Sequence, residues 1–384
     1  MRYDAVVVGA GPSGSSVARF LSEKGLKVLL IEKKRLPRFK LCGGCLSARI
    51  EDYLPDGWKR LTLNTIRGGI LGFRGREFIA KDSERAVAYI VDRADFDHFL
   101  AQKAVERGAE LWEGTEFKGF SSNGLIKVRT GKGDVTCDFL IGADGFYSRV
   151  GKSLGLAPQK YFRSVEFWTA GGTLAQDLGE RVVIDLGLVS RGYGWIFPKG
   201  DQLAIGLATS GKEDVREALG RYALGHKFLG SVTPEGVRGW MIPYSSGKSD
   251  IRIGRGRVFL VGDSAGMVDP LIGEGIFWGI KGAKLLAESI AGVEDPLRAY
   301  RKRVMEEIAP ELYTAGRIAG LAYRFQRVAF RMGAGRSLER FFDLLVGSMS
   351  YSDLYGKGIR EFLRTLLHFE NFLHIIIDNI LRRR

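Results

Sequence analysis

Residues 3–14, YDAVVVGAGPSG, decide the fold because they join a buried strand, a glycine-rich turn and the start of a helix. The β-branched and aliphatic run at 3–8 is typical of a parallel strand covered on both faces. Residues 13–25 then show helical spacing of apolar side chains, and a second apolar run, KVLLIE, follows at 27–32. Together these stretches predict a βαβ unit.

The turn of this unit has G-x-G-x-x-G spacing at Gly9, Gly11 and Gly14, and Glu32 ends the second strand. Gly9 permits the tight turn, Gly11 lets backbone approach a pyrophosphate, and Gly14 lets the helix pack closely on the strand. The helix N-terminus favours phosphate, and a carboxylate at position 32 accepts hydrogen bonds from a ribose. The pattern predicts a dinucleotide site, but it does not separate NAD from FAD.

The composition is that of a globular protein, with 384 residues, 45% hydrophobic and 27% charged. Three cysteines argue against a disulfide scaffold and favour a reducing compartment. The first strand begins at once, without a signal-peptide region, and no stretch approaches the run of about 20 apolar residues that spans a bilayer. We therefore expect a cytoplasmic protein.

The chain is basic, with a formal net charge of +14, and residues 298–384 contribute about half of that excess. Nucleic acid, an anionic lipid surface and a phosphorylated substrate all suit such a charge. Because the sequence has no helix-turn-helix, zinc-finger or RNA-binding signature, we expect no nucleic-acid partner.

Three later stretches, VDRADFD (91–97), GADGFYSRV (142–150) and VGDSAGMVDPLIGEGI (261–276), resemble signature segments of the flavin-dependent hydroxylase superfamily. The resemblance implies FAD as the cofactor. It also implies that Arg93 lies along the FAD, that Asp263 binds the ribityl chain, and that the turn 273–275 lies near the isoalloxazine ring. No second strand–GxGxxG–helix unit appears, so we expect no separate nicotinamide domain.

The loop KLCGGCLS (40–47) follows the first βαβ unit, where such flavoproteins fold a loop over the cofactor. Cys42 and Cys45 form a C-x-x-C, a spacing that elsewhere serves metal or redox chemistry. The third cysteine, Cys137, falls in a predicted strand and the four histidines are scattered, so we expect no metal site. We expect Cys45 to pack and take Cys42 as the candidate catalytic residue. The predicted cofactor-binding residues are Gly9, Gly11, Ser13, Gly14, Glu32, Gly43, Gly44, Arg93, Phe117, Asp263, Gly273, Gly275 and Ile276.

The fold class expected from these patterns is α/β (α+β). A Rossmann-like FAD-binding domain comprises residues 1–160 and 246–295, and a mostly antiparallel β-rich substrate domain comprises 161–245. Residues 66–91 are a candidate addition to the substrate domain. Residues 296–384 form a helical, basic C-terminal region.

The stretch GYGWIFPKG (192–200) places three aromatic side chains at alternate positions, on one face of a strand. Taken alone it favours an ordinary core strand, since aromatic residues are common in strands. The alternative is a flat aromatic wall for an apolar ligand. The three residues are Tyr193, Trp195 and Phe197.

This stretch and the loop at 40–47 together resemble the geranylgeranyl reductase family, which carries a K-P-C-G-G-like loop and a P-x-x-Y-x-W-x-F-P motif. The resemblance covers nearly the whole chain, including SYSDLYGKG at 350–358. The chain departs from the family pattern at Leu41, Ser190 and Ala208. The positions that match the aromatic motif are Tyr193, Trp195, Phe197 and Pro198.

The family resemblance implies an FAD-dependent reductase that saturates C=C bonds of geranylgeranyl chains, with the three aromatic residues binding a polyprenyl lipid substrate. Archaeal-type ether lipid precursors are the favoured acceptors, ahead of prenyl diphosphates and quinone side chains. The external electron donor, NAD(P)H, ferredoxin or another, is not identifiable. The alternatives are a flavin monooxygenase or halogenase, and a flavoprotein that passes electrons to quinone at a membrane.

Basic residues recur at helical spacing near the C-terminus, at Arg317, Arg324, Arg327 and Arg331, and residues 360–384 repeat the pattern. One interpretation is a surface helix packed by its apolar face, and the other is a basic amphipathic helix in a membrane interface. On the second interpretation, the protein lies peripherally on the inner face of the cell membrane. The neighbouring apolar stripe is Leu321, Phe325, Val328 and Met332.

Overall fold

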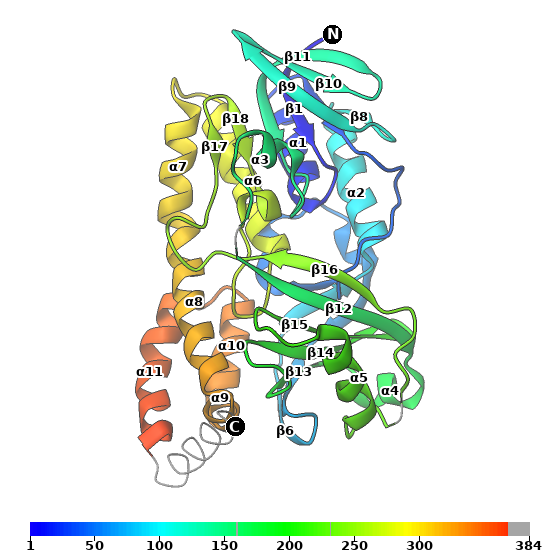
Figure 1. Ribbon diagram of the computed structural model, residues 1–384, viewed down its shortest axis with the longest axis vertical. Helices are drawn as coiled ribbons and strands as arrows, with labels where there is room; N and C mark the ends of the chain where they lie inside the picture. The colour runs from blue at the N-terminus through cyan, green and yellow to red at the C-terminus, as the bar shows by residue number, and fades with distance from the viewer. Residues whose placement is uncertain (159, 231, 368–384) are drawn as a thin grey trace.

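The computed structural model describes residues 1–158, 160–230 and 232–367 of the chain. Its elements form two main sheets with a stack of helices along one side (Figure 1). In the described residues, the first sheet consists of β17 (Gly254–Arg255), β18 (Val258–Leu260), β11 (Gly133–Gly142), β1 (Arg2–Val8), β2 (Val28–Ile31) and β8 (Glu110–Trp112), in that order, with β10 (Leu125–Thr130) and β9 (Phe117–Asn123) continuing from β11.

The centre of this sheet is parallel, since β1 pairs in parallel with both β2 and β11. α1 (Pro12–Ser22) connects β1 to β2 and packs against α2 (Arg93–Glu106) and α6 (Ile276–Ile290). The apolar runs at 3–8 and 27–32 are therefore buried in the main core, as expected for strands of a covered parallel sheet. The predicted βαβ unit is confirmed.

The second sheet is antiparallel except where β13 (Arg181–Leu186) and β5 (Gly68–Phe73) run parallel. Residues 68–82 of the first half of the chain supply its last two strands. The predicted fold class, a Rossmann-like part with a mostly antiparallel part and C-terminal helices, is confirmed. In the described residues, the order is β16 (Arg238–Pro243), β12 (Tyr161–Ala170), β15 (Gln202–Thr209), β14 (Gly192–Lys199), β13 (Arg181–Leu186), β5 (Gly68–Phe73) and β6 (Glu77–Asp82).

Smaller elements complete the fold. A three-stranded sheet of described residues consists of β3 (Cys45–Ser47), β7 (Ala88–Val91) and β4 (Thr62–Ile66). The remaining short helices are η1 (Ala48–Tyr53), η2 (Trp58–Leu61), α3 (Arg149–Ser153), α4 (Gly172–Leu178), α5 (Val215–Gly225) and η3 (Gly262–Ala265).

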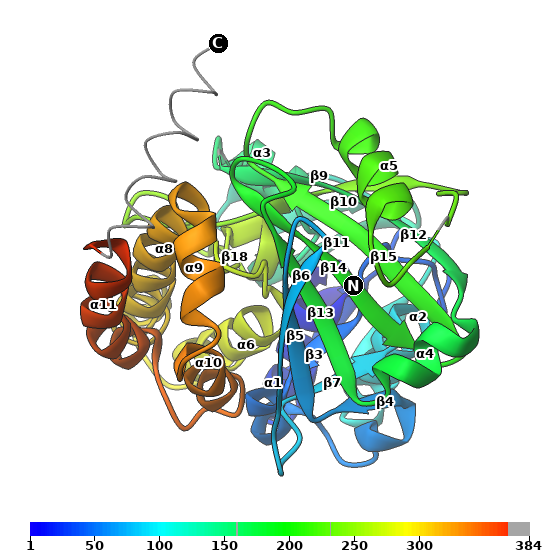
Figure 2. The ribbon, with the colours of Figure 1, turned by 90° about the horizontal axis from the view of Figure 1, so that it is seen from below.

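The C-terminal helices α8–α11 lie beside the second sheet in both views (Figures 1 and 2). No helix among the described residues is long and apolar enough to cross a membrane. The predicted basic pattern over residues 360–384 falls largely outside the described residues, and so does Arg382–Arg384 at its end. The helices are α7 (Pro296–Glu307), α8 (Ala309–Arg324), α9 (Gln326–Met332), α10 (Ser337–Leu345) and α11 (Tyr351–Leu367).

The predicted single arginine stripe over 317–331 is wrong, because α8 ends at Arg324 and α9 starts at Gln326. Phe325 between them has φ −122° and ψ 53°, which is not helical. At the break, the Gln326 side-chain amide donates to Val189 O at 2.7 Å, which ties the chain to the loop between β13 and β14. The four arginines therefore lie on two helices.

Candidate functional site

A cavity of about 1050 Å³ lies between the first sheet, the second sheet and the C-terminal helices. Gly9, Gly11 and Glu32 line one end of it, and Phe342 and Phe362 line the other. The cavity therefore joins the glycine-rich turn to the helical region through the middle of the molecule.

The glycines of the first turn are required by close packing and leave room where a ligand would lie. A Cβ on Gly14 would stand 1.9 Å from Gly9 O, and one on Gly9 would stand 2.5 Å from Ala143 O. A Cβ on Gly11, by contrast, would meet its nearest atom, Arg38 Nη2, only at 3.8 Å. α1 starts immediately after Gly11 with no side-chain cap on its first amide groups. This end of the cavity fits a pyrophosphate at a helix N-terminus.

Glu32 is buried at the same end and is held in place by backbone. Its two carboxylate oxygens accept hydrogen bonds from Ala10 N and Lys34 N, each at 3.0 Å. Arg38 Nε lies 3.5 Å from Glu32 Oε2, and Arg38 Nη1 lies 3.1 Å from Asp97 Oδ2. This arrangement fits a ribose hydroxyl at Glu32. Arg38 was missed by the sequence analysis, since it lies in a loop with several basic residues.

Arg93 is the first residue of α2 and makes a bidentate pair with Asp97, with N–O distances of 2.8 and 3.0 Å. Burial lowers the pKa of the Arg93 guanidinium, but the Asp97 carboxylate and the Cys42 thiol outweigh it and raise the pKa overall. Arg93 is thus a fixed cation beside the loop that carries Cys42.

Asp263 lies in η3, where the first sheet meets the start of α6, and it lines the cavity. Burial raises the pKa of its carboxyl, while Lys40 and Arg93 oppose that shift. A Cβ on Gly275 would lie 3.2 Å from Asp263 Oδ1, so the glycine turn passes close to this carboxyl. Gly273 has φ +68°, which favours glycine.

The other predicted cofactor-binding residues lie around the same space. Ile276 begins α6, and Phe117 is buried at the start of β9. Ser13 also packs inward, since Cβ atoms on Gly262 and Gly279 would stand 2.3 and 2.2 Å from its Oγ. The cavity lining includes Ile276, Phe117 and Ser13.

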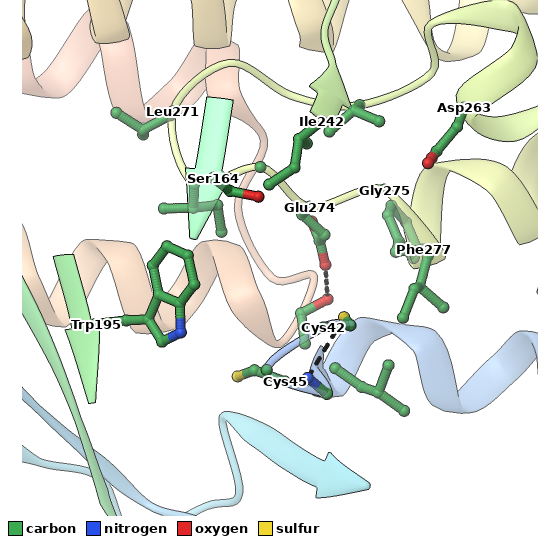
Figure 3. A pocket seen from close by; sticks show the side chains of 18 of the residues that line it. Cys42, Cys45, Ser164, Trp195, Ile242, Asp263, Leu271, Glu274, Gly275 and Phe277 are labelled. Carbon is green, nitrogen blue, oxygen red and sulfur yellow. Dashed lines mark hydrogen bonds between the residues drawn. The ribbon is translucent and has the colours of Figure 1, made fainter. Parts of the chain in front are cut away.

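The Cys42 loop lines the cavity, with Cys42 and Cys45 close to each other (Figure 3). Gly44 N donates to Cys42 Sγ at 3.4 Å. A Cβ on Gly43 would stand 2.6 Å from the Phe197 ring, and one on Gly44 would stand 2.1 Å from Val91 O. Both glycines therefore let the loop pack against strands, in addition to any approach to a cofactor.

Cys45 starts β3 on the far side of the loop. Burial, followed by the nearby Glu274 carboxylate, raises the pKa of its thiol to about 12. Glu274 itself accepts hydrogen bonds from Ser47 Oγ and Arg49 Nη2. Arg49 lies 4.3 Å from the centre of the Phe277 ring. Glu274 was missed by the sequence analysis, although it lies between the two predicted glycines of the turn.

The alternating aromatic residues of β14 face the cavity, and small residues of β15 lie beside them. Tyr193, Trp195 and Phe197 all line the cavity, with ring centroids of successive pairs 5.8 and 6.2 Å apart. Trp195 lies across Gly206, where a Cβ would stand 2.3 Å from its ring. Tyr193 OH donates to Ile272 O, and burial raises the pKa of this phenol. The stretch is both part of the core and a wall of the cavity.

The far part of the cavity is apolar and is closed by the C-terminal helices. Residues of α8, α9, α10 and α11 contribute to its lining, and most of them are apolar, with Ser337 and Tyr355 among the exceptions. Among the described residues, no cluster of three or more His, Cys, Asp or Glu could hold a metal ion. The lining includes Leu321, Met332, Phe341, Phe342, Leu345, Leu354, Ile359 and Phe362.

Comparison with known proteins agrees with this geometry. Residues 2–185 match the family model described as an FAD binding domain. Digeranylgeranylglycerophospholipid reductase of Methanothrix thermoacetophila is 32% identical over 339 residues, which cover 81% of this chain and 85% of that protein. Geranylgeranyl diphosphate reductase of Rhodobacter capsulatus is 31% identical over 301 residues, which cover 75% of each chain.

Solved structures share the fold over nearly the whole chain. A geranylgeranyl bacteriochlorophyll reductase-like protein from Thermoplasma acidophilum has a TM-score of 0.74 at 22% identity, with 98% of each chain covered. A flavin-dependent brominase has a TM-score of 0.71 at 19% identity, with 95% of this chain and 100% of that chain covered. The fold alone therefore does not separate reduction from halogenation.

Proposed function

Because the chain belongs to the geranylgeranyl reductase family of FAD-dependent oxidoreductases, we propose that it saturates C=C bonds in the geranylgeranyl chains of archaeal-type ether lipid precursors. The observation that carries the proposal is the continuous cavity. Gly9, Gly11 and Glu32 form one end of it, called here the dinucleotide cradle, and the apolar part lined by α8–α11 forms the other, called the apolar arm. FAD, when bound and reduced, supplies the hydride for such a reaction.

The residues around the cradle are the proposed cofactor contacts. The first turn and the N-terminus of α1 hold the pyrophosphate, and Glu32 accepts from the ribose. Arg93 and Asp263 line the middle of the cofactor site, and Gly273 and Gly275 keep the turn in front of α6 close to the ring system. The support for these roles is that the same cavity is lined by residues from each of these places, namely Gly9, Gly11, Glu32, Arg93, Asp263, Gly273 and Gly275.

The aromatic wall and the apolar arm are the proposed substrate site. Burying a polyprenyl chain gains about 25 cal/mol per Å² of apolar surface removed from water. Tyr193, Trp195 and Phe197 offer that surface with few torsions to freeze, because each ring is already packed in the sheet.

Cys42, on the loop between the two sites, is the proposed catalytic residue that controls substrate placement or proton supply.

The lipid that copurifies with the protein tests the substrate class. We expect mass spectrometry of an organic extract to show a geranylgeranyl ether lipid in molar amounts close to those of FAD. A prenyl diphosphate or a prenylated quinone in its place would move the assignment to that head group. Only straight-chain acyl lipids, with no isoprenoid, would contradict the proposed substrate site.

We also propose that α11 holds the apolar end of the cavity against an anionic membrane surface. Lys357, Arg360 and Arg364 are exposed along one side of α11, and Leu363 between them is 49% exposed. The opposite side of α11 lines the apolar arm. By contrast, Arg317 donates to Tyr355 OH at 3.0 Å, so not every basic residue of this region is free for lipid.

Vesicle flotation tests this placement. Binding to vesicles with phosphatidylserine should exceed binding to neutral vesicles and weaken with salt, because exposed charges are screened. The double variant Lys357→Glu/Arg360→Glu should lose most of the binding, whereas the matched charge reversal Lys24→Glu, on an exposed residue after α1, should not. Equal binding to both kinds of vesicle would show that this face serves only for solubility.

A further inference from the structure

One buried carboxyl in the cavity wall has no part in the roles proposed above. Glu166, on β12, is 2% exposed and lines the cavity. Its Oε1 accepts from Trp168 Nε1 at 2.8 Å, and its Oε2 accepts from Trp195 Nε1 at 3.0 Å. Among the described residues, no cation lies within ion-pair distance of either oxygen. Two indole N–H groups thus hold this carboxyl in the cavity wall.

The sheet places this acid beside the reacting region. Gly206 on the middle strand β15 pairs with Glu166 on β12 and with Trp195 on β14. Because glycine has no side chain, the indole of Trp195 reaches across β15 to the carboxyl of Glu166. A Cβ built on Gly43 would lie 3.5 Å from Glu166 Oε2. The carboxyl is therefore next to the Cys42 loop and on the same side of the sheet as the aromatic wall.

An ionised carboxylate is costly at such a site, since burial removes its hydration. Burial raises the pKa of Glu166, and the two indole donors, Lys199 and Lys40 act against that shift. Burial and Arg93 in turn lower the pKa of Lys40 to about 8. The charged or titratable groups around Glu166 are Lys40, Lys199 with its ion-pair partner Asp92, Arg238 opposite it on β16, and Cys42 in the adjacent loop.

We propose that Glu166 supplies the proton that completes alkene reduction. The inference rests on the proposed function. As a hydride adds to one alkene carbon, the O–H bond of Glu166 breaks and a C–H bond forms at the other carbon. The alkene gains one hydride and one proton, and the two electrons come with the hydride from the reduced flavin. The carboxylate left behind regains its proton from solvent. Cys42 then serves to place the chain.

The test is anaerobic single turnover of dithionite-reduced protein with a geranylgeranyl lipid, followed from pH 5 to pH 9. The wild-type rate should fall as the pH rises through the pKa of Glu166, because the protonated acid is the reactive form. Glu166→Gln should keep FAD, react about 10²-fold more slowly and lose that pH dependence. Glu166→Asp, which keeps a carboxyl, should be slower but keep the falling limb.

Two comparisons make the outcome decisive. Glu180→Gln, a matched change at an exposed position before β13, should leave the rate and its pH profile unchanged. A purely structural role for Glu166 would lower the rate equally at every pH. The proposal is overturned if Glu166→Gln keeps either the wild-type rate or the falling limb. If Glu166→Gln does not fold, loss of the limb in Glu166→Asp overturns it. A wild type that reduces no alkene refutes the proposed function itself.

Discussion

Gly206→Ala is the most specific packing test of the aromatic wall. The indole of Trp195 lies across this glycine, and a Cβ there would stand 2.3 Å from Trp195 Cζ2 and 2.7 Å from Val165 O. The second contact is with backbone, which cannot turn away. Trp195 must therefore shift, and its hydrogen bond to Glu166 at 3.0 Å is broken or lengthened.

The expected cost follows from two effects. Inserting a methyl group into a packed core costs about 1–3 kcal/mol. Weakening a hydrogen bond to a buried polar group costs about 1–3 kcal/mol more. We therefore expect Gly206→Ala to lower the free energy of unfolding by about 2–5 kcal/mol.

Urea unfolding followed by far-UV circular dichroism measures this loss, and near-UV circular dichroism reports the displaced indole. The matched control is Gly220→Ala in α5, where a Cβ meets nothing within 4 Å. That change should stabilise the protein by about 0.5–1 kcal/mol, because alanine favours the helix over glycine. A Gly206→Ala protein as stable as the wild type, with an unchanged near-UV spectrum, would refute the described wall.

Gly11→Val should give folded protein, because a Cβ there would meet its nearest protein atom only at 3.8 Å. The protein should be colourless, because the valine side chain occupies the space proposed for the phosphates. Normal FAD content would contradict the proposed phosphate site. Cys42→Ser should retain FAD but reduce alkenes more slowly or stop early on the chain, and Cys45→Ser should matter less; product masses decide, and unchanged turnover removes Cys42 from the mechanism. At pH 8, iodoacetamide should label Cys45 and Cys137 about a thousandfold more slowly in the native protein than in the unfolded chain, because burial raises the pKa of each thiol to about 12 and so lowers its thiolate fraction. Equal labelling rates in native and unfolded protein would contradict the raised pKa of these thiols.

Features set by local sequence were predicted well. The first turn could be read from the spacing of Gly9, Gly11 and Gly14, because a strand, a tight turn and a helix follow one another directly. The shared face of Tyr193 and Trp195 followed from the two-residue period of a strand. Both patterns are complete within a few residues of chain.

Features set by pairing between distant segments could not be predicted. Glu166 meets Trp195 only because β12, β15 and β14 are neighbours in the sheet, and no spacing in the sequence indicates that order. The need for glycine at Gly43 arises from the ring of Phe197, which is far along the chain. The arginine stripe failed because α8 ends at Arg324, and the next helix starts at Gln326, whose side chain bonds to Val189 in the distant loop between β13 and β14.

Anaerobic turnover tests the central claim most directly. Dithionite-reduced protein is mixed with a geranylgeranyl lipid in the strict absence of oxygen, and the products are measured by mass spectrometry. We predict products heavier by one pair of hydrogens for each double bond reduced. A monooxygenase or halogenase requires oxygen, and a carrier of electrons to quinone would leave every alkene intact. Recovery of the lipid with all its double bonds, from protein whose reduced FAD is intact, would contradict the assignment.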